Sequence, residues 1–94
     1  HWLMKPDDTQ KLLQGMQVKN DLEILVRKCI DKKAPAFWFS SALSHLSARR
    51  IEQGLSDLHN GCCHLSEDMT YKEEYELALI TLKKVRVFIK SLIP

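Results

Sequence analysis

The sequence predicts an all-α fold: a compact bundle of about five helices, similar to a helix-hairpin repeat, that ends in a long C-terminal helix. Only 3 of the 94 residues are Gly and 3 are Pro, so few residues interrupt helices. Apolar residues recur at three- and four-residue steps, and no useful stretch alternates at period two as a half-buried strand would. A chain of this length suits one modest core, so residues 1–94 are interpreted as a single helical protein-interaction domain. Because the first residue is His1 rather than Met, we expect a fragment of a longer protein.

Two helices are expected before residue 35. The first runs from a cap at Asp7–Asp8 to about Val18. Asn20 followed by Glu23 forms a capping box, which predicts the start of a second helix. The apolar positions of that helix end at the segment 32–35, where a proline stops it.

Two further helices are expected in the middle of the chain. A third helix is predicted for about 36–46, and Ser47 is a suitable N-cap for a fourth. Gly61 lies near the expected C-terminal stop of the fourth helix. Residues 62–69 are predicted to form a loop or a short helical extension. Before all of these, Trp2 is expected to pack on the core.

The last helix is the most strongly indicated. Thr70 and Glu73 form a capping box, and acidic residues occupy its first turns while basic residues occupy its C-terminal half. Its apolar seam steps by three and four residues through Tyr75, Ala78, Leu82, Val85, Ile89 and Leu92. The seam is widened by Leu77, Leu79, Ile80, Val87 and Phe88. A face this wide predicts that other helices cover the last helix on several sides.

Charge and cysteine content exclude several classes of function. The net charge is only +2, from 14 basic and 12 acidic residues, so nucleic acid is not the expected partner. No stretch approaches the roughly 20 apolar residues that cross a bilayer, so no membrane partner is expected. Three cysteines without framework spacing indicate reduced thiols, as in the cytoplasm or nucleus.

No cofactor, metal or catalytic site is expected. One short segment holds four candidate zinc ligands, but structural zinc usually takes two pairs from separate segments. These candidates are His59, Cys62, Cys63 and His64. Cys29 lies on an apolar helix face, which indicates a core residue rather than a nucleophile, and His45 is interpreted as a helix-surface residue. The three isolated glycines form no phosphate-binding loop, so the domain is predicted not to be an enzyme.

Three consecutive aromatic residues, Phe37, Trp38 and Phe39, form the first candidate partner-binding site. Successive residues of a helix turn by about 100°, so the three rings cannot all face one side. Either all three are buried between neighbouring helices, or at least one of them faces a partner, because aromatic residues are favoured anchors at interfaces.

A basic stripe on the last helix forms the second candidate site. Lys83, Arg86 and Lys90 are spaced by three and four residues and therefore lie side by side. The stripe, with neighbouring Lys84, is either a solvated face that complements the helix dipole or a docking site. Its partner would then be an acidic protein or peptide, an acidic tubulin tail, or nucleic acid.

The order of several short elements resembles the C-terminal helical domain of the katanin regulatory subunit, which contains WD repeats. The shared elements, in order, are Trp2, Asp8, Asn20-Asp21-Leu22, Val26, Lys33-Ala34, Trp38, Ile51-Glu52, Leu55, Tyr71, Tyr75, Leu82-Lys83 and Leu92-Ile93-Pro94. They cover nearly the whole chain, but each is at most three residues long. Residues 57–69 depart from the family pattern and form a longer segment here.

The resemblance implies a helical domain that pairs with the N-terminal domain of a microtubule-severing ATPase and recruits spindle-pole or microtubule-end proteins. The chemistry would belong to that katanin-type catalytic subunit, and the expected location is cytoplasmic, at the cytoskeleton or spindle pole. The departure at 57–69 leaves a divergent relative open, or the helical tail of a WD-repeat ribosome-biogenesis factor in the nucleus or nucleolus. A generic homodimerising scaffold domain is a further alternative.

Overall fold

The computed structural model describes residues 6–92, with side chains from Leu13 onward, and this part of the chain is helical without strands. The elements in chain order are α1 (Pro6–Asp31), α2 (Phe37–Ser47), α3 (Ile51–Ser66), the 3₁₀ turn η1 (Met69–Tyr71) and α4 (Lys72–Leu92). The all-α prediction is confirmed, but the predicted number of helices is wrong by one. The expected packing of Trp2 lies outside the described residues.

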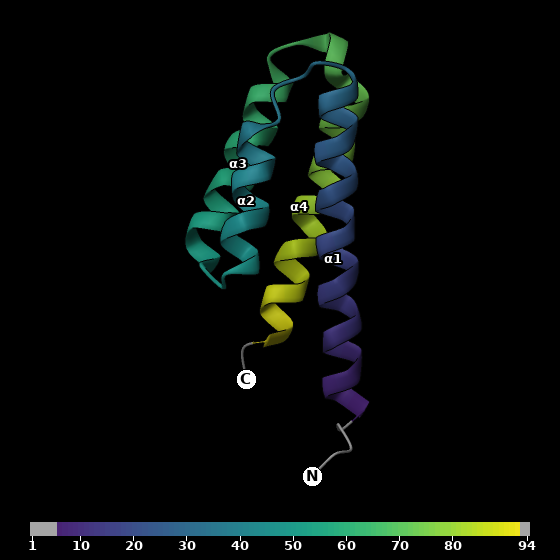
Figure 1. Ribbon diagram of the computed structural model, residues 1–94, viewed down its shortest axis with the longest axis vertical. Coiled ribbons are helices and arrows are strands. Elements are labelled where there is room, and N and C mark those ends of the chain that lie inside the picture. Colours follow the sequence, from purple (N-terminus) through teal and green to yellow (C-terminus); the bar gives the residue numbers. More distant parts are fainter. Residues whose placement is uncertain (1–5, 93–94) are drawn as a thin grey trace.

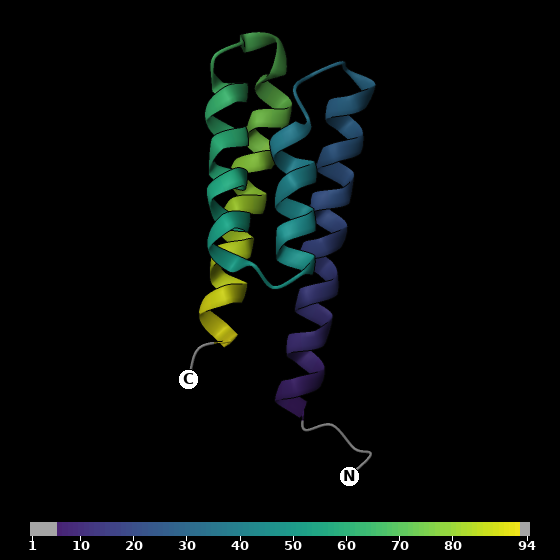
Figure 2. The same ribbon diagram turned by 60° about the vertical axis from the view of Figure 1, so that its left-hand side comes forward.

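The four helices form an antiparallel bundle in which α1 packs on α2, α2 on α3, α3 on α4, and α4 on α1 (Figure 1). Among the described residues, the backbones of helices that lie diagonally across this ring do not come close to each other. The α2–α3 hairpin is shorter than the pair formed by α1 and α4. Both long helices therefore continue past the turn between α2 and α3, as Figure 2 shows.

The predicted break after Val18 is wrong, because α1 is one helix of 26 residues. A residue that is favourable at a helix N-cap does not by itself end the preceding helix. Asn20 lies within α1, and its side chain is exposed to solvent. Across the expected gap, Nε2 of Gln17 donates to Oδ1 of Asp21 at 3.0 Å, an i, i+4 contact that supports the helix. Asp7–Asp8 lie inside the first turn rather than at the cap, since α1 begins at Pro6.

The first two helices end in the same way, with a residue in the left-handed region. Lys33 has φ 60°, and the amide of Ala34 donates to the carbonyl of Cys29 at 2.8 Å. Arg49 has φ 64°, and the amide of Arg50 donates to the carbonyl of His45 at 2.8 Å. Both ends are Schellman motifs, which satisfy the last carbonyl groups of each helix and reverse the chain direction.

The predicted boundaries of α3 and α4 also need correction. Ser47 is the last residue of α2 rather than a cap, and the N-cap of α3 is Arg50, which makes no side-chain capping bond. The capping box at Thr70 does not form, because Asp68 caps this point by accepting from the amide of Thr70 at 2.9 Å. That bond holds the pKa of the Asp68 carboxyl below its ordinary value.

Gly61 lies in the middle of α3 and is buried, so the predicted stop there is wrong and residues 62–66 extend the helix. A methyl group added at Gly61 would lie 2.6 Å from Cε1 of Phe39, whose side chain is fully buried. The other two glycines also lie in helices, opposite a large side chain: Gly15 opposite Phe88, and Gly54 opposite Leu46. Each glycine lets a neighbouring helix come close.

The core lies at the centre of the ring, with residues from every α-helix. Its fully buried large side chains include Leu22, Leu25, Phe39, Leu58, Leu65 and Val85. The predicted seam of α4 is confirmed for Ala78, Leu82 and Val85, while Tyr75 and Ile89 pack against the core half-buried and Leu92 is exposed. Cover on several sides is not found, because Leu79, Ile80 and Val87 remain exposed.

An ion pair between a buried carboxylate and a half-exposed lysine joins the end of α1 to α4 at the upper end of the bundle. Glu74 is 3% exposed, and its Oε2 lies 3.3 Å from Nζ of Lys32. The hydrogen bond to Glu74, followed by the negative charge of Glu74, raises the pKa of Lys32. Lys32 itself stays at the surface, with 46% of its side chain exposed.

We predict that Gly61→Ala destabilises the fold, because the new methyl group has no room beside Phe39. Overpacking of this kind costs about 1–3 kcal/mol, more than the gain of about 1 kcal/mol from better helix propensity. Urea unfolding measures the difference.

The matched control is Gly15→Ala, where the added methyl group would lie 3.2 Å from the tip of the half-buried Phe88 ring. We expect this variant to be neutral or stabilised by up to about 1 kcal/mol. If Gly61→Ala is as stable as Gly15→Ala, the close contact between α2 and α3 is not as described.

Candidate protein-binding site

An open apolar groove runs between α1 and α4 on the side of the bundle that faces away from α2 and α3. Its volume is about 470 Å³. It is lined by Gln14, Gln17, Val18, Ile80, Lys83, Lys84, Val87 and Phe88. The groove exists because two helices form this side of the ring, and no other element within residues 6–92 covers the line between them.

The walls of the groove expose large apolar side chains. Ile80 is 53% exposed and Val87 is 64% exposed, while Val18 and Phe88 are half-buried. Phe88 settles against α1 because Gly15 has no side chain to displace it. Sequence reasoning assigned Ile80 and Val87 to the helix–helix interface and therefore missed the groove, although it identified both as part of one apolar face.

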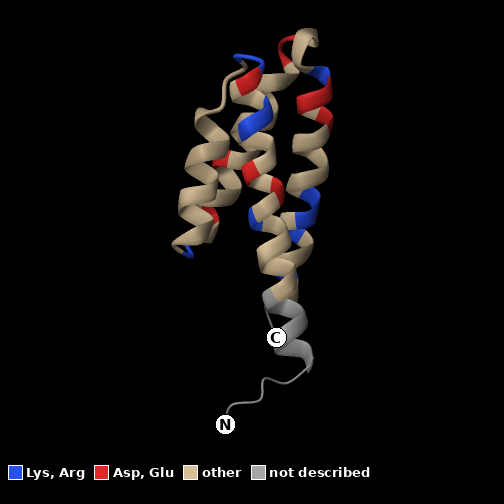
Figure 3. Cartoon of the chain, turned by 45° about the vertical axis from the view of Figure 1, so that its right-hand side comes forward, with Lys and Arg blue, Asp and Glu red and all other residues tan. Residues whose placement is uncertain are grey.

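Two lysines supply the charge at the edge of the groove. Nζ of Lys84 lies 3.4 Å from Oδ2 of Asp21, so α1 partly neutralises it. Lys83 makes no ion pair with the side chains that the structure describes. The basic residues of α4 cluster in its C-terminal half, and the acidic ones lie near its start (Figure 3). The edge of the groove is therefore basic.

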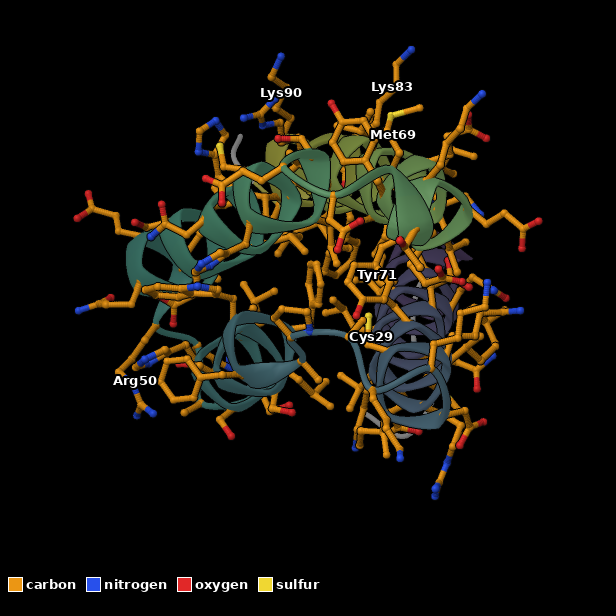
Figure 4. All side chains as sticks on the ribbon, turned by 90° about the horizontal axis from the view of Figure 1, so that it is seen from above. Cys29, Arg50, Met69, Tyr71, Lys83 and Lys90 are labelled. Carbon is orange, nitrogen blue, oxygen red and sulfur yellow. The ribbon has the colours of Figure 1, made fainter. Side chains whose placement is uncertain are left out.

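The structure places the predicted basic stripe on an exposed surface of α4. Lys83, Arg86 and Lys90 are all exposed, and Lys83 and Lys90 project from the bundle on the same side (Figure 4). Of these three residues, only Lys83 lines the groove. The second basic residue that lines the groove is Lys84. Arg86 and Lys90 lie outside the groove.

The three consecutive aromatic residues have three different environments. Phe39 is fully buried under Gly61, so it is a core residue and not accessible to a partner. Trp38 is half-buried, and its Nε1 donates to Nδ1 of His64 at 2.8 Å. Phe37 is 70% exposed and meets Trp38 edge to face, with ring centroids 5.4 Å apart. The argument that three consecutive rings cannot all face one side is confirmed. The interpretation that all three are buried between neighbouring helices is wrong, because Phe37 is exposed.

The four candidate zinc ligands point in different directions around α3. Cys62 is buried in the core, and His64 is bonded to Trp38. Only His59 and Cys63 meet, with Nδ1 and Sγ 3.8 Å apart. Within residues 13–92, no group of three or more His, Cys, Asp or Glu side chains could hold a metal ion.

A polar cluster between α2 and α3 contains a serine, a histidine and an aspartate, but not in a catalytic order. Oγ of Ser41 donates to Oδ2 of Asp57 at 2.5 Å. Nε2 of His45 lies 3.5 Å from the same oxygen, and Nε of Arg50 donates to Nδ1 of His45 at 2.8 Å. The serine hydroxyl is bonded to the carboxylate rather than to the imidazole, so the order of a Ser-His-Asp triad is not formed.

Comparison with known proteins finds no matching family model, no matching curated protein and no matching solved structure. None of the described helices is long and apolar enough to cross a membrane.

We predict that only one thiol of the folded protein reacts rapidly with a disulfide reagent at pH 8. Cys63 is exposed, whereas burial raises the pKa of both Cys29 and Cys62 from 9.0 to about 11 and keeps them protonated. Cys63→Ser should remove the rapid phase, and unfolding should release the other two thiols. Rapid reaction of Cys29 would contradict its burial.

The same shift of pKa gives a pH dependence of stability. Between pH 9 and about 11 the unfolded chain loses protons from Cys29 and Cys62 while the folded chain retains them. These two thiols therefore stabilise the fold below pH 9, and their contribution is lost as the pH rises through 11.

Proposed function

We propose that this chain is a non-catalytic protein-interaction domain that binds a helix of a partner protein in the groove between α1 and α4. The observation that carries the proposal is the exposure of Ile80 and Val87 on the walls of an apolar groove. Apolar side chains of this size gain about 1.5–3 kcal/mol each when they become fully buried. A partner helix would supply that burial.

The shape and charge of the groove favour an amphipathic helix as the bound segment. A helix laid between α1 and α4 places anchors at i, i+3 or i+4, and i+7 along the groove, a common mode of helix recognition. Lys83 and Lys84 at the edge favour acidic residues on the flank of the partner helix. Such edge charges act mainly on the association rate and on its dependence on salt.

The resemblance to the katanin regulatory subunit suggests the partner. We propose the N-terminal helical domain of a katanin-type severing ATPase as the first partner to test, which would place the protein in the cytoplasm at the cytoskeleton or spindle pole. The alternatives, a nuclear or nucleolar ribosome-biogenesis factor and a homodimerising scaffold, are separate outcomes of the experiment below.

We predict that Ile80→Glu reduces binding to that ATPase domain at least tenfold, because a carboxylate replaces an apolar contact in the groove. Leu79→Glu is the matched control: it is adjacent in sequence, 40% exposed and outside the groove. Titration calorimetry of both variants measures the effect, and circular dichroism checks that both remain folded.

Equal affinities of the Ile80 and Leu79 variants would contradict the groove as the binding site. If wild type binds RNA instead of the ATPase domain, the ribosome-biogenesis alternative is favoured. If it forms only a concentration-dependent dimer that Ile80→Glu disrupts, the groove is a homodimer interface.

A further inference from the structure

A second surface site lies between α2 and α3, on the side of the bundle opposite the groove. It is a shallow pocket of about 220 Å³, lined by Trp38, Asn60, Cys63, His64 and Glu67. Only α2 and the C-terminal end of α3 contribute to it, whereas only α1 and α4 line the groove. Because these two helix pairs form opposite sides of the ring, one partner helix cannot occupy both sites.

The pocket holds its tryptophan in a fixed orientation. The bond from Nε1 of Trp38 to Nδ1 of His64 satisfies the only polar atom of the indole. The two rings are tilted by 36° with centroids 6.3 Å apart, and Phe37 meets Trp38 edge to face. The indole is therefore held by two neighbours while part of its surface remains open to solvent.

The electrostatics of the pocket favour a cation. Glu67, the C-cap residue of α3, is the one acidic residue among the described residues that line the pocket, and its side chain is exposed. The C-terminus of α3 adds the negative end of its helix dipole. Nδ1 of His64 already accepts the hydrogen bond from Nε1 of Trp38. Among the side chains that the structure describes, no Lys or Arg lines the pocket.

We infer that this pocket binds an arginine side chain of a protein partner, stacked on Trp38 and paired with Glu67. A planar guanidinium stacks on an indole and donates two parallel hydrogen bonds to a carboxylate, which an ammonium group cannot do. The groove selects an acidic segment and the pocket a basic one. The domain thereby joins two partner segments of opposite charge on opposite faces.

Nuclear magnetic resonance titration of the 94-residue protein tests this inference, with the indole Nε1–H signal of Trp38 as the readout. The probe is an acetylated and amidated Gly-Arg-Gly peptide, and its control is the same peptide with citrulline, which has nearly the same shape without the charge. The spectrum of Trp38→Phe assigns the signal, since the chain also contains Trp2. We expect a saturable shift with the arginine peptide and about three- to tenfold weaker binding of the citrulline peptide.

Two variants make the result specific. Glu67→Gln should weaken binding of the arginine peptide about two- to fivefold, whereas Glu52→Gln, at the other end of α3 and outside the pocket, should not. Ile80→Glu should also leave it unchanged, so failure of the groove and failure of the pocket are distinguishable. No saturable shift, equal affinity for citrulline, or full binding by Glu67→Gln would each overturn the inference.

Discussion

The close approach of α2 and α3 at Gly61 determines much of the surface as well as the core. The Phe39 ring lies where any side chain at position 61 would have to lie, so the two helices are held at a short distance. With Phe39 fixed inward, the rotation of about 100° per residue turns Trp38 toward His64 and leaves Phe37 in solvent. The arrangement of the α2–α3 pocket thus follows from one contact in the core.

The groove follows from a different constraint, the number of neighbours that each helix has in a ring of four. A helix in such a ring contacts two others, which bury little more than one stripe of its surface. The apolar face of α4 is wider than that stripe: Leu82 and Val85 fill the core, while Ile80 and Val87 on the other side of the same helix remain exposed. The groove differs from an exposed part of the core because polar residues flank it: Lys83 and Lys84 keep the edge of the groove solvated.

Local patterns in the sequence predicted the fold class and the buried positions Ala78, Leu82 and Val85 of α4, since apolar spacing of three and four residues depends only on helix geometry. The same patterns did not predict the helix boundaries. Asn20 is a favourable capping residue, but α1 continues through it, and Asp68 rather than Thr70 is the capping residue before α4. The sequence indicated that Phe37, Trp38 and Phe39 could not share one side, but which of them is exposed depends on the contact with Gly61, 22 residues beyond Phe39. The groove could not be predicted, because it depends on which helices are neighbours in space.

The central claim is that the uncovered line between α1 and α4 is where a partner helix lies. Isotope-filtered nuclear Overhauser spectroscopy of the labelled domain with the unlabelled N-terminal domain of the severing ATPase tests this most directly. The account predicts intermolecular contacts to the methyl groups of Ile80 and Val87 and none to those of Leu79, which lies outside the groove. Contacts to Leu79 without contacts to Ile80 or Val87 would contradict it.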